Sequence, residues 1–168
     1  MPYLEGVEMA KSSSSKNGQK LKTKEVLVGE NRKARHEYEL TDSFEAGMVL
    51  RGTEVKVLRQ GQISLAEAYA RFKDDQLYLI NANIPEYSHG NQQNHEPKRW
   101  RKLLLKRKEL EKLKEQTQMK GLTLVPLRVF FGAKGYAKCL IGVGRGRKTH
   151  DKRSHLKEKD LKREMRGD

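Results

Sequence analysis

The feature that most limits the possible folds is a pair of β-branched and aromatic runs late in the chain. Thr123 to Phe131 and Tyr136 to Val143 flank a short glycine-containing segment, 132–135. Two such runs on either side of a turn are typical of a β-hairpin. The sequence therefore predicts an antiparallel sheet with this hairpin in it.

The other periodic segments predict short strands and helices around the hairpin. Strands are expected at 36–40, 54–58, 68–72 and 76–80, and a further extended piece ends at Pro85. A helix is expected from Thr41 to about Gly52, with Glu45 in its first turn, and a long one at 98–118. About six strands and three helices favour a mainly β fold: a small closed antiparallel β-barrel similar to an oligonucleotide-binding fold.

Composition divides the chain into three parts. Residues 1–30 contain a serine run and predict a flexible leader, residues 31–144 are expected to form the barrel domain, and residues 145–168 are expected to form a basic tail. The tail has ten Lys and Arg residues against five Asp and Glu, and few large apolar side chains. We therefore expect it to be disordered when free and to become ordered on a polyanion.

The charge of the chain indicates a nucleic-acid partner. The formal net charge is +14, and 35% of the residues are charged. A basic surface attracts phosphate polymers and speeds their capture. No apolar run approaches the roughly 20 residues that span a bilayer, so we expect a cytoplasmic protein without a membrane partner. The single cysteine, Cys139, lies within an apolar run and is predicted to be a buried core residue.

Four cationic runs, at 31–36, 98–108, 145–148 and 151–153, concentrate this charge. Any one run could be a solvated face. Three of the four lie beside His36, Trp100 or His150, and rings that stack on bases beside cations that hold phosphates are typical of proteins that bind unpaired RNA. For Trp100 the sequence leaves three alternatives open: packing within the protein, a surface position without a particular role, and stacking on RNA.

The candidate motifs for catalysis and metal binding lack residues that those motifs require. The glycines at 142, 144 and 146 resemble a phosphate-binding loop, but arginine stands at position 147, where that motif requires glycine. The histidine pairs 89/95 and 150/155 lack further ligands at zinc-like spacing. We therefore expect no enzyme, no cofactor and no metal site.

A series of short sequence motifs, taken in order along the chain, resembles a known family. The motifs are Asn31 to Tyr38 (NRKARHEY), 44–47 (FEAG), 52–56 (GTEVK), 58–59 (LR), 94–97 (NHEP), 101–105 (RKLLL) and 151–153 (DKR). Over about residues 31–165 the chain resembles the SsrA-binding proteins of bacteria, the SmpB family.

The resemblance implies a function in trans-translation. Proteins of this family bind the tRNA-like domain of transfer-messenger RNA (tmRNA, or SsrA RNA) and deliver it to stalled ribosomes, which leads to peptide tagging and ribosome rescue. Expected partners are tmRNA charged with alanine, elongation factor Tu, and the 30S decoding centre with its 16S rRNA. The C-terminal tail is expected to become helical in the decoding centre and empty mRNA channel. The protein itself is expected to be monomeric.

The resemblance also implies site residues. RNA-binding roles are expected for Asn31, Lys33, Arg35, His36, Glu45, Arg101, Lys102 and Leu104. Roles on the ribosome are expected for the tail residues Arg145, Arg147, Lys148, His150, Asp151, Lys152 and Arg153. Core packing is an equally good role for Leu104, and a helix-start contribution is the alternative for Glu45. The alternative function is a general ribosome-associated or single-stranded RNA-binding module.

Overall fold

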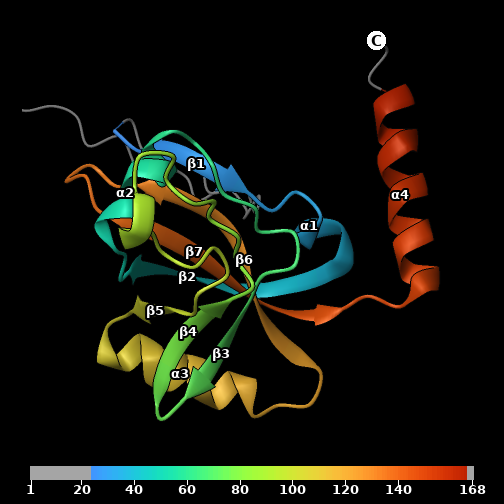
Figure 1. The fold of residues 1–168 in the computed structure, drawn as a ribbon. Helices are drawn as coiled ribbons and strands as arrows, with labels where there is room; N and C mark the ends of the chain where they lie inside the picture. The colour runs from blue at the N-terminus through green and yellow to red at the C-terminus, as the bar shows by residue number, and fades with distance from the viewer. Residues whose placement is uncertain (1–23, 166–168) are drawn as a thin grey trace, which may run out of the picture.

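The computed structural model describes residues 24–165, and the predicted serine-rich segment of the leader lies outside them. The described part holds seven antiparallel strands, four α-helices and a 3₁₀ turn at 91–93 (Figure 1). In chain order the elements are β1 (Val26–Glu30), α1 (Ala34–Glu37), β2 (Tyr38–Met48), α2 (Gly52–Arg59), β3 (Tyr69–Lys73), β4 (Gln76–Ile80), β5 (Arg101–Leu104), α3 (Arg107–Thr117), β6 (Leu122–Phe131), β7 (Ala137–Gly146) and α4 (Thr149–Glu164).

Six of the strands form a closed ring, which confirms the predicted antiparallel barrel. The hydrogen-bonded order is β6, β3, β4, β5, β2 and β7, and β7 pairs again with β6. One edge of β6 is shared between two partners: its first half meets β3 at Leu124, and its second half pairs with β1. The seventh strand, β1, therefore extends the sheet outside the ring, and it lies in the last residues of the predicted leader.

The predicted hairpin is confirmed as β6 and β7, which pair from Leu122 to Phe131. Its turn uses Gly135 at φ +81°, a conformation that favours glycine. Inward-facing residues of the two strands, including Val129, Ile141 and Val143, form the centre of the main core. The other elements of the barrel therefore pack against this hairpin.

The predicted helix from Thr41 to Gly52 is wrong, because these residues lie largely in β2. This strand pairs with β7 from Tyr38 to Gly47. The close approach requires a small residue: a Cβ at Gly144 would lie 2.9 Å from the Glu39 carbonyl oxygen. Gly142 and Gly144, two of the three glycines that resembled a phosphate loop, therefore allow β7 and β2 to pack closely.

The predicted strand at 54–58 is also wrong, since these residues form α2. The Glu54 carboxylate accepts a hydrogen bond from the Arg51 amide at 2.7 Å, which satisfies a free donor at the helix start. Val57 and Leu58 are buried in a cluster with Ile84 and Phe131. Gly61, at positive φ, turns the chain after α2.

The predicted long helix at 98–118 is divided into β5 and α3. Residues 101–104 pair with both β4 and β2, so they close the barrel. Helix α3 begins only at Arg107, and it buries Leu113 in the main core. The strands predicted at 68–72 and 76–80 are confirmed as β3 and β4, which pair with each other from Tyr69–Ile80 to Lys73–Gln76.

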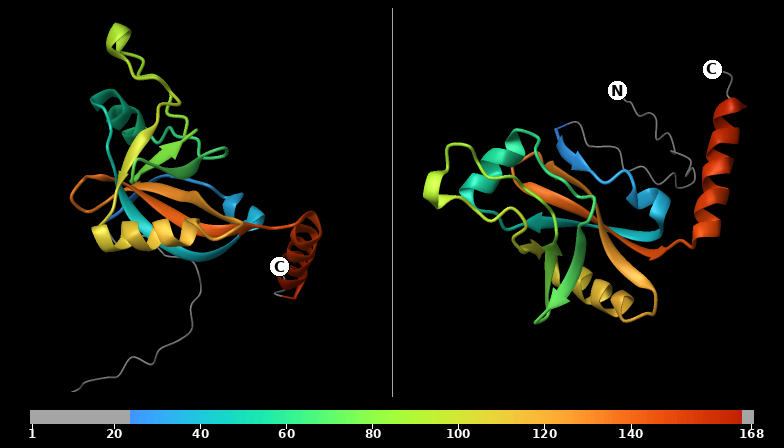
Figure 2. Two further views of the ribbon diagram at one scale, coloured as in Figure 1. Left: turned by 90° about the horizontal axis from the view of Figure 1, so that it is seen from below. Right: turned by 45° about the vertical axis from the view of Figure 1, so that its right-hand side comes forward.

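Helix α4 projects from the end of β7, away from most of the barrel (Figure 2). It contacts α1, while Leu156 and Leu161 remain about half exposed. The expected tail is therefore helical over 149–164 in this structure. That it lacks stable structure in the free protein stays a prediction.

Candidate nucleic-acid interface

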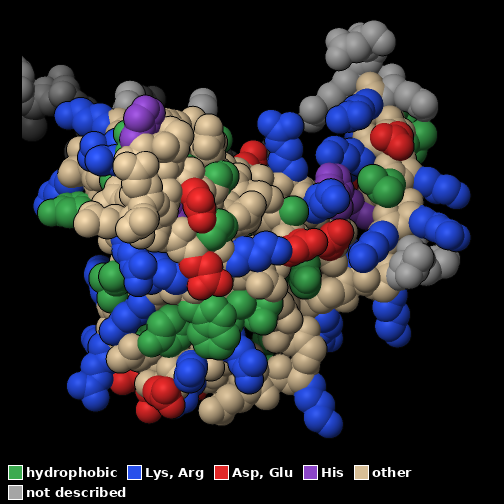
Figure 3. All heavy atoms as spheres, viewed as in Figure 1, with side chains coloured by type: hydrophobic (Ala, Val, Ile, Leu, Met, Phe, Trp, Pro, Cys, Tyr) green, Lys and Arg blue, Asp and Glu red, His purple; other side chains and the backbone are tan. Residues whose placement is uncertain are grey.

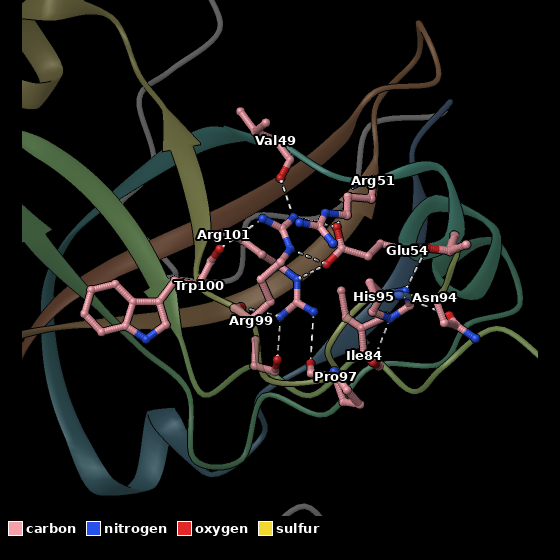
Figure 4. A network of polar contacts seen from close by, with 12 residues as sticks. Val49, Arg51, Glu54, Ile84, Asn94, His95, Pro97, Arg99, Trp100 and Arg101 are labelled. Carbon is pink, nitrogen blue, oxygen red and sulfur yellow. Dashed lines mark hydrogen bonds and ion pairs between the residues drawn. The ribbon is translucent and has the colours of Figure 1, made fainter. Parts of the chain in front are cut away.

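A buried ionic network fixes the strand that carries several predicted site residues. Glu54 of α2 and Arg101 of β5 are both fully buried, and Arg101 Nε donates to the Glu54 carboxylate at 2.9 Å. Arg99 donates to the same carboxylate from Nε and Nη2. The remaining Arg101 donors reach the carbonyl oxygens of Ala82, Pro97 and Arg99 (Figure 4).

This geometry corrects the expected role of Arg101. Its side chain is fully buried, and each of its three guanidinium nitrogens donates a hydrogen bond inside the protein, so it cannot reach an RNA phosphate. Burial acts to raise the pKa of the Glu54 carboxyl, but hydrogen bonds from Arg99 and the Arg51 amide, and the charge of Arg101, outweigh burial and lower the pKa below its usual value. The carboxylate stays ionised, and the network holds β5 against α2.

Asn31 is another predicted contact residue that the fold largely covers. It is 8% exposed, its amide nitrogen donates to the Leu65 carbonyl oxygen at 3.2 Å, and its side-chain oxygen accepts from the Ala34 amide at 3.2 Å. The side chain therefore supports the start of α1.

The cations predicted beside Asn31 lie near the base of the tail. Lys33 and Arg35 are exposed on and before α1. His36 packs edge-on against His155 of α4, with ring centroids 5.9 Å apart. The Arg147 amide donates to the Glu37 carbonyl oxygen at 2.8 Å. The first and third cationic runs of the sequence thus meet at the joint between α1 and α4.

Glu45 and Leu104 lie on the outer face of the sheet, at the junction of β2 and β5. Leu104 is 51% exposed and stands opposite Gly47, where a Cβ would lie 3.5 Å from its own. Glu45 belongs to β2 and forms an ion pair with Lys138 of β7. The predicted helix-start role of Glu45 is therefore wrong, and the core alternative for Leu104 is wrong as well. Lys102 is half-buried on the same side of β5.

The tail residues occupy the end of β7 and the first turns of α4. Arg145 and Lys148 are exposed, Arg147 and Lys152 are half-buried, and Arg153 is exposed. The side chains of His150 and Asp151 lie outside the described part of the structure. The predicted site residues consequently form two groups, one at the α1–α4 joint and one on the outer face of β2 and β5.

His95 and Cys139, whose side chains can take part in chemistry in other proteins, are both buried in this one. His95 is 1% exposed; its Nε2 donates to the Ile84 carbonyl oxygen at 3.0 Å, and its Nδ1 accepts from the Thr53 hydroxyl at 2.9 Å. Cys139 is fully buried, which confirms it as a core residue, and burial raises the pKa of its thiol to about 12.

Within residues 24–165 there is no cluster of three or more possible metal ligands and no helix suited to crossing a membrane.

Sequence reasoning missed a set of outward residues on β3 and β4. Tyr69, Arg71 and Lys73 alternate with inward positions of β3, and Tyr78 of β4 stands opposite Arg71. A cleft of about 310 Å³ lies beside them, at the seam where β3 meets β6. The alternation of residues 69–73 was the available signal, because alternate side chains of a strand share a face.

Most of this sequence matches one known protein family. The family model described as "SmpB protein" matches residues 28–168. An "SsrA-binding protein" of Rhizorhabdus wittichii is 52% identical over 142 residues, which cover 84% of this chain and 89% of the relative. One of Halalkalibacterium halodurans is 50% identical over 85% of this chain and 92% of the relative.

A solved structure has a similar fold. It is described as "tmRNA-SmpB: a journey to the center of the bacterial ribosome", and it matches with a TM-score of 0.61 and 50% sequence identity over 71% of this chain and 84% of the other. The family match extends through both groups of predicted site residues and through α4. The chain therefore belongs to the SmpB family of SsrA-binding proteins.

Proposed function

We propose that this protein binds the tRNA-like domain of tmRNA and carries it to stalled ribosomes for trans-translation. The observation that carries the proposal is about 50% identity, over most of the chain, to proteins named for binding SsrA RNA. The net charge of +14 suits a polyanionic partner. The protein acts in the cytoplasm as a monomeric RNA-binding factor, with no cofactor and no chemistry of its own.

Two surfaces of the protein have separate roles in this proposed function. The barrel binds the tRNA-like domain through its outer face at Glu45, Lys102 and Leu104 and through the exposed cations of α1. The tail, from Arg145 to the end of α4, enters the decoding centre and the empty mRNA channel of the 30S subunit. Support for this division comes from the separation of α4 from most of the barrel and from its exposed charged side chains. Elongation factor Tu and alanyl-tmRNA join the same complex.

Deletion of residues 149–168 tests the division. This variant keeps all of β7, so the barrel should retain its fold and its affinity for the tRNA-like domain. Peptide tagging on ribosomes stalled without a stop codon should be lost, because the α4 part of the tail is missing. RNA affinity and tagging are measured on the same preparation, and an equal loss of both activities contradicts the division.

A substitution on the outer face of the barrel gives the complementary test. Glu45→Gln removes a charge that forms an ion pair on the barrel face, while the whole tail is left in place. The proposal expects this variant to change affinity for the tRNA-like domain, with a loss of tagging that follows the fraction of RNA bound. Normal affinity combined with lost tagging would place Glu45 on the ribosomal surface.

A further inference from the structure

An exposed aromatic surface lies on the outside of β3, β4 and β5. We call it the aromatic face, and its residues are Tyr69, Arg71, Lys73, Tyr78, Trp100 and Lys102. Figure 3 shows a hydrophobic patch bordered by Lys and Arg side chains in the region where Figure 1 places β4 and β5. None of its aromatic residues belongs to the set of sites expected from the family.

The residues of the aromatic face are held in a fixed arrangement by strand pairing. Tyr78 stands between Arg71 of β3 and Lys102 of β5. The ring of Trp100 lies 6.1 Å from that of Tyr78, tilted by 51°. Lys73 Nζ is 5.4 Å from the centroid of the indole ring. Ring and cation are thus preorganised next to each other.

All the charged residues of the aromatic face are positive. Strands β3, β4 and β5 contain no Asp or Glu, and their outward charged residues are Arg71, Lys73 and Lys102, because Arg101 is buried against Glu54. Asp74 and Asp75 lie beyond the face, in the turn after β3, and Asp75 forms an ion pair with Lys114 of α3. The outer side of the three strands therefore complements a phosphate chain.

Packing within the protein does not explain the exposure of Trp100. Its side chain is 44% exposed, whereas the neighbouring Arg101 and Leu103 are at most 2% exposed. Figure 4 shows Trp100 pointing away from the buried network around Glu54. A large ring that only filled space would be covered, because burial of apolar area is the source of its stabilisation.

We propose that the aromatic face binds unpaired nucleotides of the tRNA-like domain, with a base stacked on Trp100 and phosphates held by Lys73, Arg71 and Lys102. Rings beside cations bind unstacked bases without a sequence code. Lys102 and Leu104 point to the same side of β5, so the aromatic face continues the surface proposed for tmRNA. The inference rests on that proposed function and extends its surface.

Fluorescence of the unaltered protein tests the proposal directly. Trp100 is the single tryptophan of the chain, so its emission reports on this site alone. Titration with the tRNA-like domain should quench the emission in parallel with binding measured by filter retention. Unchanged emission at saturating RNA overturns the proposal, whatever the variants do.

Matched variants give a second test. Trp100→Leu keeps an apolar side chain and the net charge, and it should weaken RNA binding about 5- to 100-fold, the range measured for one stacked base. Trp100→Phe keeps a ring and should lose less. Tyr136→Leu, at a tyrosine that is 70% exposed on the β6–β7 hairpin, should bind normally. Thermal unfolding of each variant checks that the barrel is intact.

Salt dependence separates stacking from charge. Trp100→Leu should leave the slope of log affinity against log salt unchanged, whereas Lys73→Gln should reduce that slope by about one. Equal losses in Trp100→Leu and Tyr136→Leu overturn the stacking site while the proposed function stands. A wild-type chain that fails to bind the RNA overturns the proposed function and this inference with it.

Discussion

Neighbouring residues of β5 serve opposite purposes, because successive side chains of a strand point to opposite faces. Arg101 and Leu103 point into the protein, while Lys102 and Leu104 face outward. A sequence motif such as RKLLL therefore mixes two functions. Loss of RNA binding after substitution of Arg101 would reflect damage to the barrel, whereas the same loss at Leu104 would reflect a lost contact.

At this scale we expect Glu54→Gln to lower the free energy of unfolding by about 3–5 kcal/mol. The change removes the negative partner of a buried pair and leaves Arg101 charged and uncompensated, which is costly in a protein interior. Chemical denaturation followed by circular dichroism measures the loss. The matched control is Glu67→Gln, whose ion pair with Lys98 is exposed at 3.8 Å and should change stability by less than about 0.5 kcal/mol.

The same network gives a pH dependence. The folded protein lowers the pKa of Glu54 below its usual value of 4.5, so its ionisation stabilises the fold above that pH. This stability is lost as pH falls from about 4.5 through the lowered pKa. Glu54→Gln should lack that part of the acid transition. An identical acid profile in both proteins would contradict the assigned role of Glu54.

At the scale of elements, local patterns predicted the parts of the barrel that pair locally. The β3–β4 and β6–β7 hairpins join neighbouring segments, so alternation and turn residues were enough. Residues 41–48 contain helix formers and an acceptable helix start, yet they form β2, whose partner β7 is about 100 residues away in the chain. Propensity is a weak prior when a distant strand offers an edge.

Glu54 shows the same limit for a predicted strand. The alternation of Val55 and Val57 suited a strand, but the partners that fix Glu54 at the start of α2 are Arg99 and Arg101. These lie some 45 residues later and cannot be recognised from a local window. For the site, the exposure of Leu104 and the burial of Arg101 depended on the strand register, which the helix predicted at 98–118 concealed.

Helix α4 is expected to be the least stable of the described elements. An isolated helix of its length is marginal in water, and its leucines Leu156 and Leu161 are about half exposed. Backbone amides of α4 should exchange with solvent far faster than those of β7 in the free protein. Hydrogen exchange followed by mass spectrometry measures this. Protection of α4 equal to that of β7 would show a stably folded tail before any ribosome is present.

At the scale of the whole molecule, the structure combines a rigid barrel with a charged helix that projects from it. The barrel carries two groups of candidate RNA contacts, at the α1–α4 joint and on the outer face of β2 and β5, the latter extended by the aromatic face. General electrostatic attraction alone would give affinity for any RNA. Selection of one RNA must come from the shape of these surfaces and from contacts with unpaired bases.

Competition binding tests this central claim most directly. Labelled tRNA-like domain bound to the full chain is displaced by unlabelled tRNA-like domain or by unlabelled ordinary tRNA at the same salt concentration. The account predicts that tRNA competes more weakly by more than about tenfold, which corresponds to about 1.4 kcal/mol of binding free energy. Equal competition by the two RNAs would contradict it and would identify the protein as a general RNA-binding module.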